Sequence, residues 1–128
     1  MEATIQKKLS SSYDEALSRL PDALKSEGFG VLTEIDVAKT LKDKLGADFR
    51  RYKILGACNP TLAHRALSLT LEVGVMLPCN VVVYESDDGR AVVQTIDPIR
   101  TVAASDPRLA DLAATVRAKL VRVLEQLS

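Results

Sequence analysis

The sequence predicts one α+β domain over residues 1–128, on three observations. A helix start signal follows a short alternating apolar segment, two β-rich runs flank Asp88-Gly89, and a long apolar stripe at helical spacing closes the chain. The 128 residues are 47% hydrophobic and 27% charged, which is enough length and apolar content to bury a core. The sequence shows no internal repeat and no linker, so we expect a single soluble domain.

The first part of the chain predicts a strand followed by a helix. Apolar residues alternate with polar ones over residues 3–9, except that Lys7 interrupts the alternation. Ser12 and Glu15 have the spacing of a capping box, in which each side chain satisfies a free backbone N–H group at the helix start. Pro21 lies inside this helix and removes one of its hydrogen bonds, so we expect it to kink or split the helix.

The middle of the chain predicts two strands and two helices. The second strand is expected to place four side chains on one face: Phe29, Val31, Thr33 and Ile35. Asp36 is expected to cap a short helix whose apolar edge is formed by Val37, Leu41 and Leu45. The third strand is expected to place three side chains on one side: Tyr52, Ile54 and Cys58. Asn59 is a good N-cap residue and Pro60 suits the first helical position, so Cys58 lies where a strand meets a helix N-terminus.

The residues around Asp88-Gly89 predict a β-hairpin, because this dipeptide suits a tight turn with positive φ. A loop of two or four residues would place one set of side chains on one face: Cys79, Val81, Val83, Val92 and Ile96. It would place another set on the opposite face: Val82, Tyr84, Ala91 and Val93. Both faces are apolar, which a sheet with one solvated face should not show. We therefore expect a homodimer that covers the second face.

The C-terminal segment predicts a helix that covers the sheet. Asp106 is its expected cap, and Pro107 fits the first helical position. The apolar stripe consists of Leu109, Leu112, Ala113, Val116, Leu120, Val123, Leu124 and Leu127. The basic side chains between these positions are expected to form the solvated side of the helix.

The charge pattern argues against nucleic acid and membrane as partners. Lys plus Arg and Asp plus Glu number 17 each, so the chain lacks the basic excess that phosphate binding needs. The densest basic run, from Arg50 to Lys53, is expected to be a solvated strand entry. The longest uncharged run has 12 residues and contains Pro78, which is too short for a membrane-spanning helix. No secretory leader is evident, so we expect a cytoplasmic protein with reduced thiols.

The chemical motifs of common enzymes are missing, so no catalytic residue is assigned. There is no glycine-rich phosphate loop and no nucleophile elbow. The single histidine, His64, is expected to be a surface residue and not a metal ligand. The two cysteines, Cys58 and Cys79, leave two alternatives open. They pack as small apolar residues, or they form with Asn59 a thiol site that binds a soft metal, Cu(I) or Zn, or cycles its redox state.

The placement of the two thiols depends on how their strands pair. If the strands that contain Cys58 and Cys79 are antiparallel, both thiols lie at one end of the sheet, whereas a parallel pair would separate them. The residue pattern alone does not choose between these arrangements.

Three segments together resemble the family called domain of unknown function 302: "EGFGVLTEIDVAKTLKDKLG", "YKILGACNPTLAHRAL" and "LPCNVVVYESDDG". The resemblance extends from Ile5 to the last helix. It implies a curved antiparallel sheet with helices packed on one face, in the order β-α-β4-α with short inserted helices, as in TATA-binding-protein-like folds. It therefore favours the antiparallel arrangement of the two thiols. The family has no assigned activity, so the resemblance implies no catalytic residue, and a fold alone does not imply DNA binding.

These observations together predict a small non-catalytic binding or assembly module that forms a homodimer through its sheet. The alternative is the thiol site at Cys58 and Cys79. No cofactor is expected under the first interpretation, and no small-molecule ligand is specified by the sequence.

Overall fold

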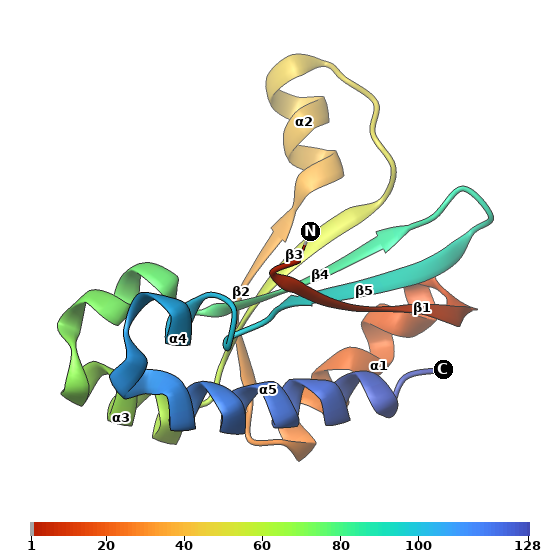
Figure 1. Cartoon of the computed structure of the whole chain (residues 1–128). Helices are drawn as coiled ribbons and strands as arrows, with labels where there is room; N and C mark the ends of the chain where they lie inside the picture. The colour runs from red at the N-terminus through yellow and green to blue at the C-terminus, as the bar shows by residue number, and fades with distance from the viewer. Residues whose placement is uncertain (1) are drawn as a thin grey trace.

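The computed structural model describes residues 2–128, in which five strands form an open sheet (Figure 1). The strands are β1 (Thr4–Ser12), β2 (Gly30–Asp36), β3 (Tyr52–Cys58), β4 (Cys79–Glu85) and β5 (Arg90–Ile96). Their order across the sheet is β1-β5-β4-β3-β2, and every neighbouring pair is antiparallel. The antiparallel arrangement of β3 and β4 is therefore the observed one.

The helical segments are α1 (Tyr13–Ser26), α2 (Val37–Leu45), α3 (Pro60–Leu69), η1 (Leu71–Met76), α4 (Val102–Ser105), η2 (Pro107–Leu109) and α5 (Ala110–Glu125). With α2, α3, η1, α4 and η2 as insertions, the element order is the predicted β-α-β4-α, so the expected fold class is confirmed. Among the helices of residues 2–128, none is long and apolar enough to cross a membrane.

The two faces of the sheet have different surroundings. Figure 1 shows α1 and α5 against one face, here called the inner face, whose buried side chains are Leu9, Leu55, Val81, Val83, Ala91 and Val93. The opposite, outer face carries on its three central strands Tyr52, Ile54, Asn80, Val82, Tyr84, Val92, Gln94 and Ile96. Figure 1 places α2 on the outer side, away from α1 and α5, and α2 has no buried side chain.

The β4–β5 hairpin shows that the predicted face assignment of β5 was wrong. Val83 pairs with Val93 and Glu85 with Ala91, so the loop has an odd number of residues. Ser86 N donates to Arg90 O at 2.9 Å and Gly89 N to Ser86 O at 3.0 Å, with Gly89 at φ 82°. This is a three-residue loop with glycine in the left-handed position. Because side chains alternate along a strand, the odd loop places Ala91 and Val93 on the inner face, and Val92 and Ile96 on the outer face.

A bulge in β2 changes a second predicted face. Val31 pairs with Ala57 and Thr33 with Gly56, so Leu32 is an extra residue between them. The prediction that Phe29, Val31, Thr33 and Ile35 share one face is therefore wrong. Val31 lies on the α1 side with Ala57, whereas Thr33 and Ile35 lie on the outer face.

The predicted helix starts are confirmed at the four cap positions. Ser12, Asp36, Asn59 and Asp106 each accept a hydrogen bond from a backbone N–H group of the following segment. The predicted split of α1 at Pro21 does not occur, because α1 continues from Tyr13 to Ser26. Pro21 lies on the exposed side of the helix, where water can bind the carbonyl group that loses its N–H partner.

Lys7, which interrupts the apolar alternation of β1, has a specific role at the end of α5. It pairs with Val93 and so points to the inner face. Its Nζ donates to Leu124 O at 3.2 Å and to Leu127 O at 2.5 Å. The ammonium group thus binds carbonyl groups at the negative end of the helix dipole, where Leu124 O also accepts from Leu127 N at 3.1 Å. Lys7 therefore ties β1 to α5.

We predict that Lys7→Met lowers the free energy of unfolding by roughly 2 kcal/mol, because charge-assisted hydrogen bonds to part-buried carbonyl groups are lost. Lys8→Met is the matched control in the same strand, since Lys8 points outward and forms an exposed ion pair with Asp88. Urea unfolding should show a much smaller loss for Lys8→Met. Equal losses in the two variants would contradict this role of Lys7.

Candidate functional site

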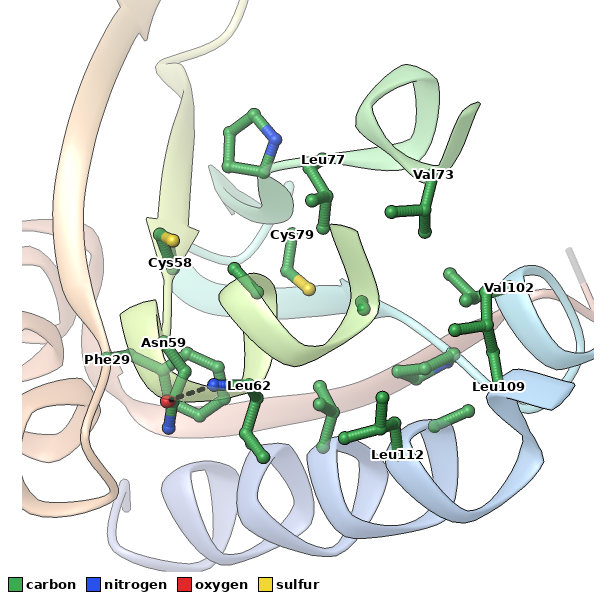
Figure 2. A pocket seen from close by; sticks show the side chains of 17 residues that line it. Phe29, Cys58, Asn59, Leu62, Val73, Leu77, Cys79, Val102, Leu109 and Leu112 are labelled. Atoms are coloured by element: carbon green, nitrogen blue, oxygen red, sulfur yellow. Dashed lines mark hydrogen bonds between the residues drawn. The ribbon is translucent and has the colours of Figure 1, made fainter. Parts of the chain in front are cut away.

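Cys58 and Cys79 line one cavity at the end of the sheet where β3 finishes and β4 begins (Figure 2). Ala57 pairs with Cys79, so Cys58 lies one residue beyond the partner of Cys79. The cavity has a volume of about 60 Å³, and α3, η1, α4 and α5 contribute to its walls. An unfilled space of this size costs on the order of 1 kcal/mol of stability relative to a filled core.

Asn59 turns the chain from β3 into α3 beside the cavity. Its Oδ1 accepts from Leu62 N at 3.2 Å, which caps the helix, and its Nδ2 donates to Glu27 O at 3.4 Å. Pro60 occupies the first turn of α3 as predicted. Because both ends of the Asn59 amide have partners within the chain, this residue has a structural role here.

Cys79 is positioned by the approach of Pro78 to β3. The Leu77–Pro78 peptide bond is cis. A Cβ atom on Gly56 would lie 2.8 Å from Pro78 Cγ and 2.2 Å from Thr33 Oγ1, so only glycine fits at that position. Figure 2 shows the Cys79 sulfur pointing into the cavity and away from Cys58. The close contact of Pro78 with β3 thus fixes where the Cys79 thiol enters the cavity.

The chemistry of the cavity is neutral and apolar. Burial raises the pKa of the Cys79 thiol to about 11, with a smaller contribution from the nearby Cys58. At neutral pH Cys79 is therefore a protonated thiol. Both cysteines are free, so no disulfide joins them. None of the 17 residues that line the cavity carries a charge.

The cavity wall that η1 forms was not predicted from the sequence. It includes η1, whose Val73 is buried with Leu62, Ala66, Leu109 and Leu112 in a second small core. An uncharged run covers residues 73–84 and so begins inside η1. Within it, the only signal for this wall is the spacing of Val73 and Leu77, which are four residues apart. Such a short segment does not distinguish a 3₁₀ helix from a strand.

His64 lies on α3 and is exposed to solvent, as expected, and it does not line the cavity. Within residues 2–128, no group of three or more His, Cys, Asp and Glu side chains could hold a metal ion. The structure therefore brings together Cys58, Asn59 and Cys79, and leaves His64 apart from them.

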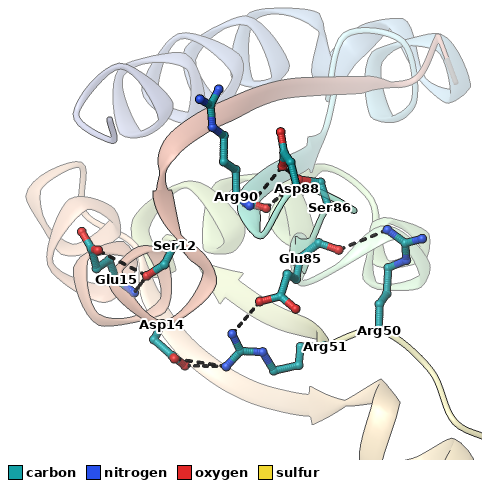
Figure 3. Close-up of polar contacts among 9 residues, drawn as sticks. All are labelled: Ser12, Asp14, Glu15, Arg50, Arg51, Glu85, Ser86, Asp88 and Arg90. Atoms are coloured by element: carbon teal, nitrogen blue, oxygen red, sulfur yellow. Dashed lines mark hydrogen bonds and ion pairs between the residues drawn. The ribbon is translucent and has the colours of Figure 1, made fainter.

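The basic run at Arg50 and Arg51 is paired with acidic groups (Figure 3). Arg50 donates to the carbonyl of Glu85 at 3.1 Å, as Figure 3 shows. It also binds Asp87 at 3.0 Å. Arg51 donates to both oxygens of Asp14 at 3.0 and 3.1 Å and to Glu85 at 2.6 Å. Its guanidinium also lies 4.6 Å from the ring centroid of Tyr13. These arginines join the start of α1 to the end of the sheet where β3 begins and β4 finishes.

The outer face presents a second candidate site. The rings of Tyr52 and Tyr84 are stacked, with centroids 5.6 Å apart and an interplanar angle of 7°. Phe49, just before β3, lies 6.2 Å from Tyr52 and is half exposed. Ile54 and Val82 continue the apolar surface between the strands. This face is thus an aromatic and aliphatic surface that the helices on the inner face do not cover.

Comparison with known proteins identifies the family. The family model described as "Domain of unknown function DUF302" matches residues 5–127. A search of solved structures matches the "Crystal structure of uncharacterized conserved protein DUF302 from Bacillus stearothermophilus", with 35% identity and a TM-score of 0.92 over 100% of both chains. A search of curated proteins finds no match. With nearly its whole length matched, the chain belongs to the DUF302 family.

Proposed function

We propose that this protein is a non-catalytic assembly module that works as a homodimer, with the outer face of the sheet as the interface. The observation that carries the proposal is the composition of this face on β3, β4 and β5. Apart from Arg90 at the start of β5, the side chains there are uncharged and mostly apolar, while α1 and α5 cover only the inner face. Centres of protein interfaces are depleted of charge and enriched in aromatic residues. The outer face has both properties.

The polar groups at the margins of the outer face support the same proposal. Gln94 Nε2 donates to Gln6 Oε1 at 2.8 Å, so these two amides are already paired with each other. Lys8, at the edge, binds Asp88 at 2.8 Å. An interface centred on β4 would therefore bury apolar surface, with Arg90 at the hairpin end of β5 left at its margin.

A second copy of the chain is the occupant that we favour, because a two-fold axis through β4 would place this surface against itself. Such an interface uses the same residues on both copies. Tyr84 and Val82 would then contact their equivalents. Phe49 and Ile35, which are half exposed, would extend the contact toward α2.

We predict that the protein sediments as a dimer at micromolar concentration, and that Val82→Lys converts it to a monomer by placing a charge at the centre of the interface. Val75→Lys is the matched control, because Val75 on η1 is 90% exposed and lies outside the outer face. Analytical ultracentrifugation should show a dimer for the control variant. Circular dichroism spectra should show that both variants are folded.

A monomer in the unmodified protein would contradict the homodimer. The outer face would also be contradicted as the interface if Val75→Lys were a monomer and Val82→Lys remained a dimer. That result would place the interface at η1.

We also propose that the protein does not act on nucleic acid. The formal net charge is zero, and Arg50, Arg51 and Lys53 each bind a carboxylate of the same chain. Few cations are then left to release counterions from a phosphate backbone.

We predict no retention of random duplex DNA by the protein at micromolar concentration and physiological salt, measured by fluorescence anisotropy. Retention that weakens steeply as salt rises would show that these basic groups bind phosphate after all.

The thiol site at Cys58 and Cys79 is the alternative function. In its favour, both cysteines line the same cavity and are free, and reduced thiols suit the cytoplasm that we propose as the location. Against it, a metal requires the thiolate, and the raised pKa of Cys79 makes this form costly. The balance favours cysteines that pack in the cavity wall.

We predict that Cys79 reacts with iodoacetamide at pH 7 about a hundredfold more slowly than a thiol of pKa 9.0, because a pKa of about 11 lowers its thiolate fraction by that factor. Its rate should rise with pH until the pH approaches 11. We also expect dialysed protein to retain neither Cu(I) nor Zn²⁺.

One equivalent of Cu(I) retained by the protein, and lost in both Cys58→Ala and Cys79→Ala, would establish the thiol site instead. Mass spectrometry of the labelled peptides measures the reactivity of each cysteine separately.

A further inference from the structure

We propose that the cavity beside Cys79 is a binding site for a small, neutral, apolar molecule. This inference goes beyond the homodimer, because the cavity lies at the end of the sheet between α3, η1 and α5, whereas the proposed interface is the outer face. It rests on the polarity, the size and the walls of the cavity.

The polarity of the cavity excludes charged ligands. Its walls are mainly aliphatic, and the Asn59 amide is the one polar side chain other than the thiols among the lining residues. Both groups of that amide are already bonded, to Leu62 N and to Glu27 O. An anion or cation would enter without a counter-charge, at a large desolvation cost. Apolar cavities accept apolar guests.

The size of the cavity limits the guest to a few heavy atoms. A cavity of roughly 150 Å³ lined by apolar side chains binds benzene or xenon. The present volume of about 60 Å³ is less than half of that. The ligand class is therefore a molecule smaller than benzene, unless the wall moves. Nucleotides, sugars and amino acids are too large and too polar.

Residues of and beside η1 form one wall of the cavity. This segment has two turns of 3₁₀ helix, and it has no side-chain cap. Val73 and Leu77 face the cavity, whereas Leu71 is 85% exposed on the other side of the same segment. This segment thus has one side in the cavity wall and the other in solvent.

The experiment uses xenon as the probe, with acetate as a small charged comparison. We expect xenon to shift the methyl resonances of Leu109 and Val73 in a saturable manner, and acetate to leave them unchanged. Ala113→Leu should fill the cavity, because Ala113 lines it, and should weaken xenon binding by about tenfold or more. Ala114→Leu, the adjacent position on α5, is exposed and should bind xenon as the unmodified protein does.

If Ala113→Leu does not fold, Ala63→Val on α3 is the second filling variant, since Ala63 also lines the cavity. Absence of a xenon effect at these methyl groups would overturn the proposal. So would equal shifts with acetate, xenon binding that survives in the filled variant, or ordered water found beside Cys79. The sedimentation of each variant is measured separately, so failure of this site and failure of the homodimer are distinguishable.

Discussion

The three-residue loop from Asp87 to Gly89 sets the face on which every residue of β5 lies. With this loop, Val83 pairs with Val93, and both point toward α1 and α5. A loop one residue shorter or longer would move Val93 to the outer face and bring Gln94 into the core. β5 also carries β1, so the same register directs Lys7 inward to the end of α5. The packing of the whole inner face therefore depends on this turn.

The two candidate sites depend on two different strand pairings of the sheet. On the outer face, the β4–β5 pairing sets Tyr84 opposite Val92 and Val82 opposite Gln94 across the central strands. On the inner face, the pairing of Ala57 with Cys79 brings the thiol to the sheet end, where α5 begins and the long helices no longer fill the space. One sheet thus presents a broad, mostly apolar surface and a small apolar cavity, and the two are suited to different kinds of partner.

The sequence predicts local structure here better than it predicts contacts between distant residues. The cap residues Ser12, Asp36, Asn59 and Asp106 are recognisable because each acts within three residues of itself. The three-residue hairpin loop and the bulge at Leu32 each shift by one residue the side chains that point to a given face of the sheet. The Asp88-Gly89 dipeptide is compatible with an odd or an even loop, and the residue pattern of β2 is compatible with a strand that has a bulge or one that has none. The wall of the cavity depends on η1 packing against α3 and α5, which no local pattern specifies.

We propose that a second copy covers the outer face of the sheet, whereas helices of the same chain cover the inner face. Isotope-filtered NMR on a mixture of methyl-labelled and unlabelled protein detects contacts between the two copies. We expect intermolecular NOEs from the methyl groups of Ile54 and Val82 to the rings of Tyr52 and Tyr84 of the second copy. Intermolecular NOEs confined to Leu71 and Val75 on η1, or none at all, would contradict it.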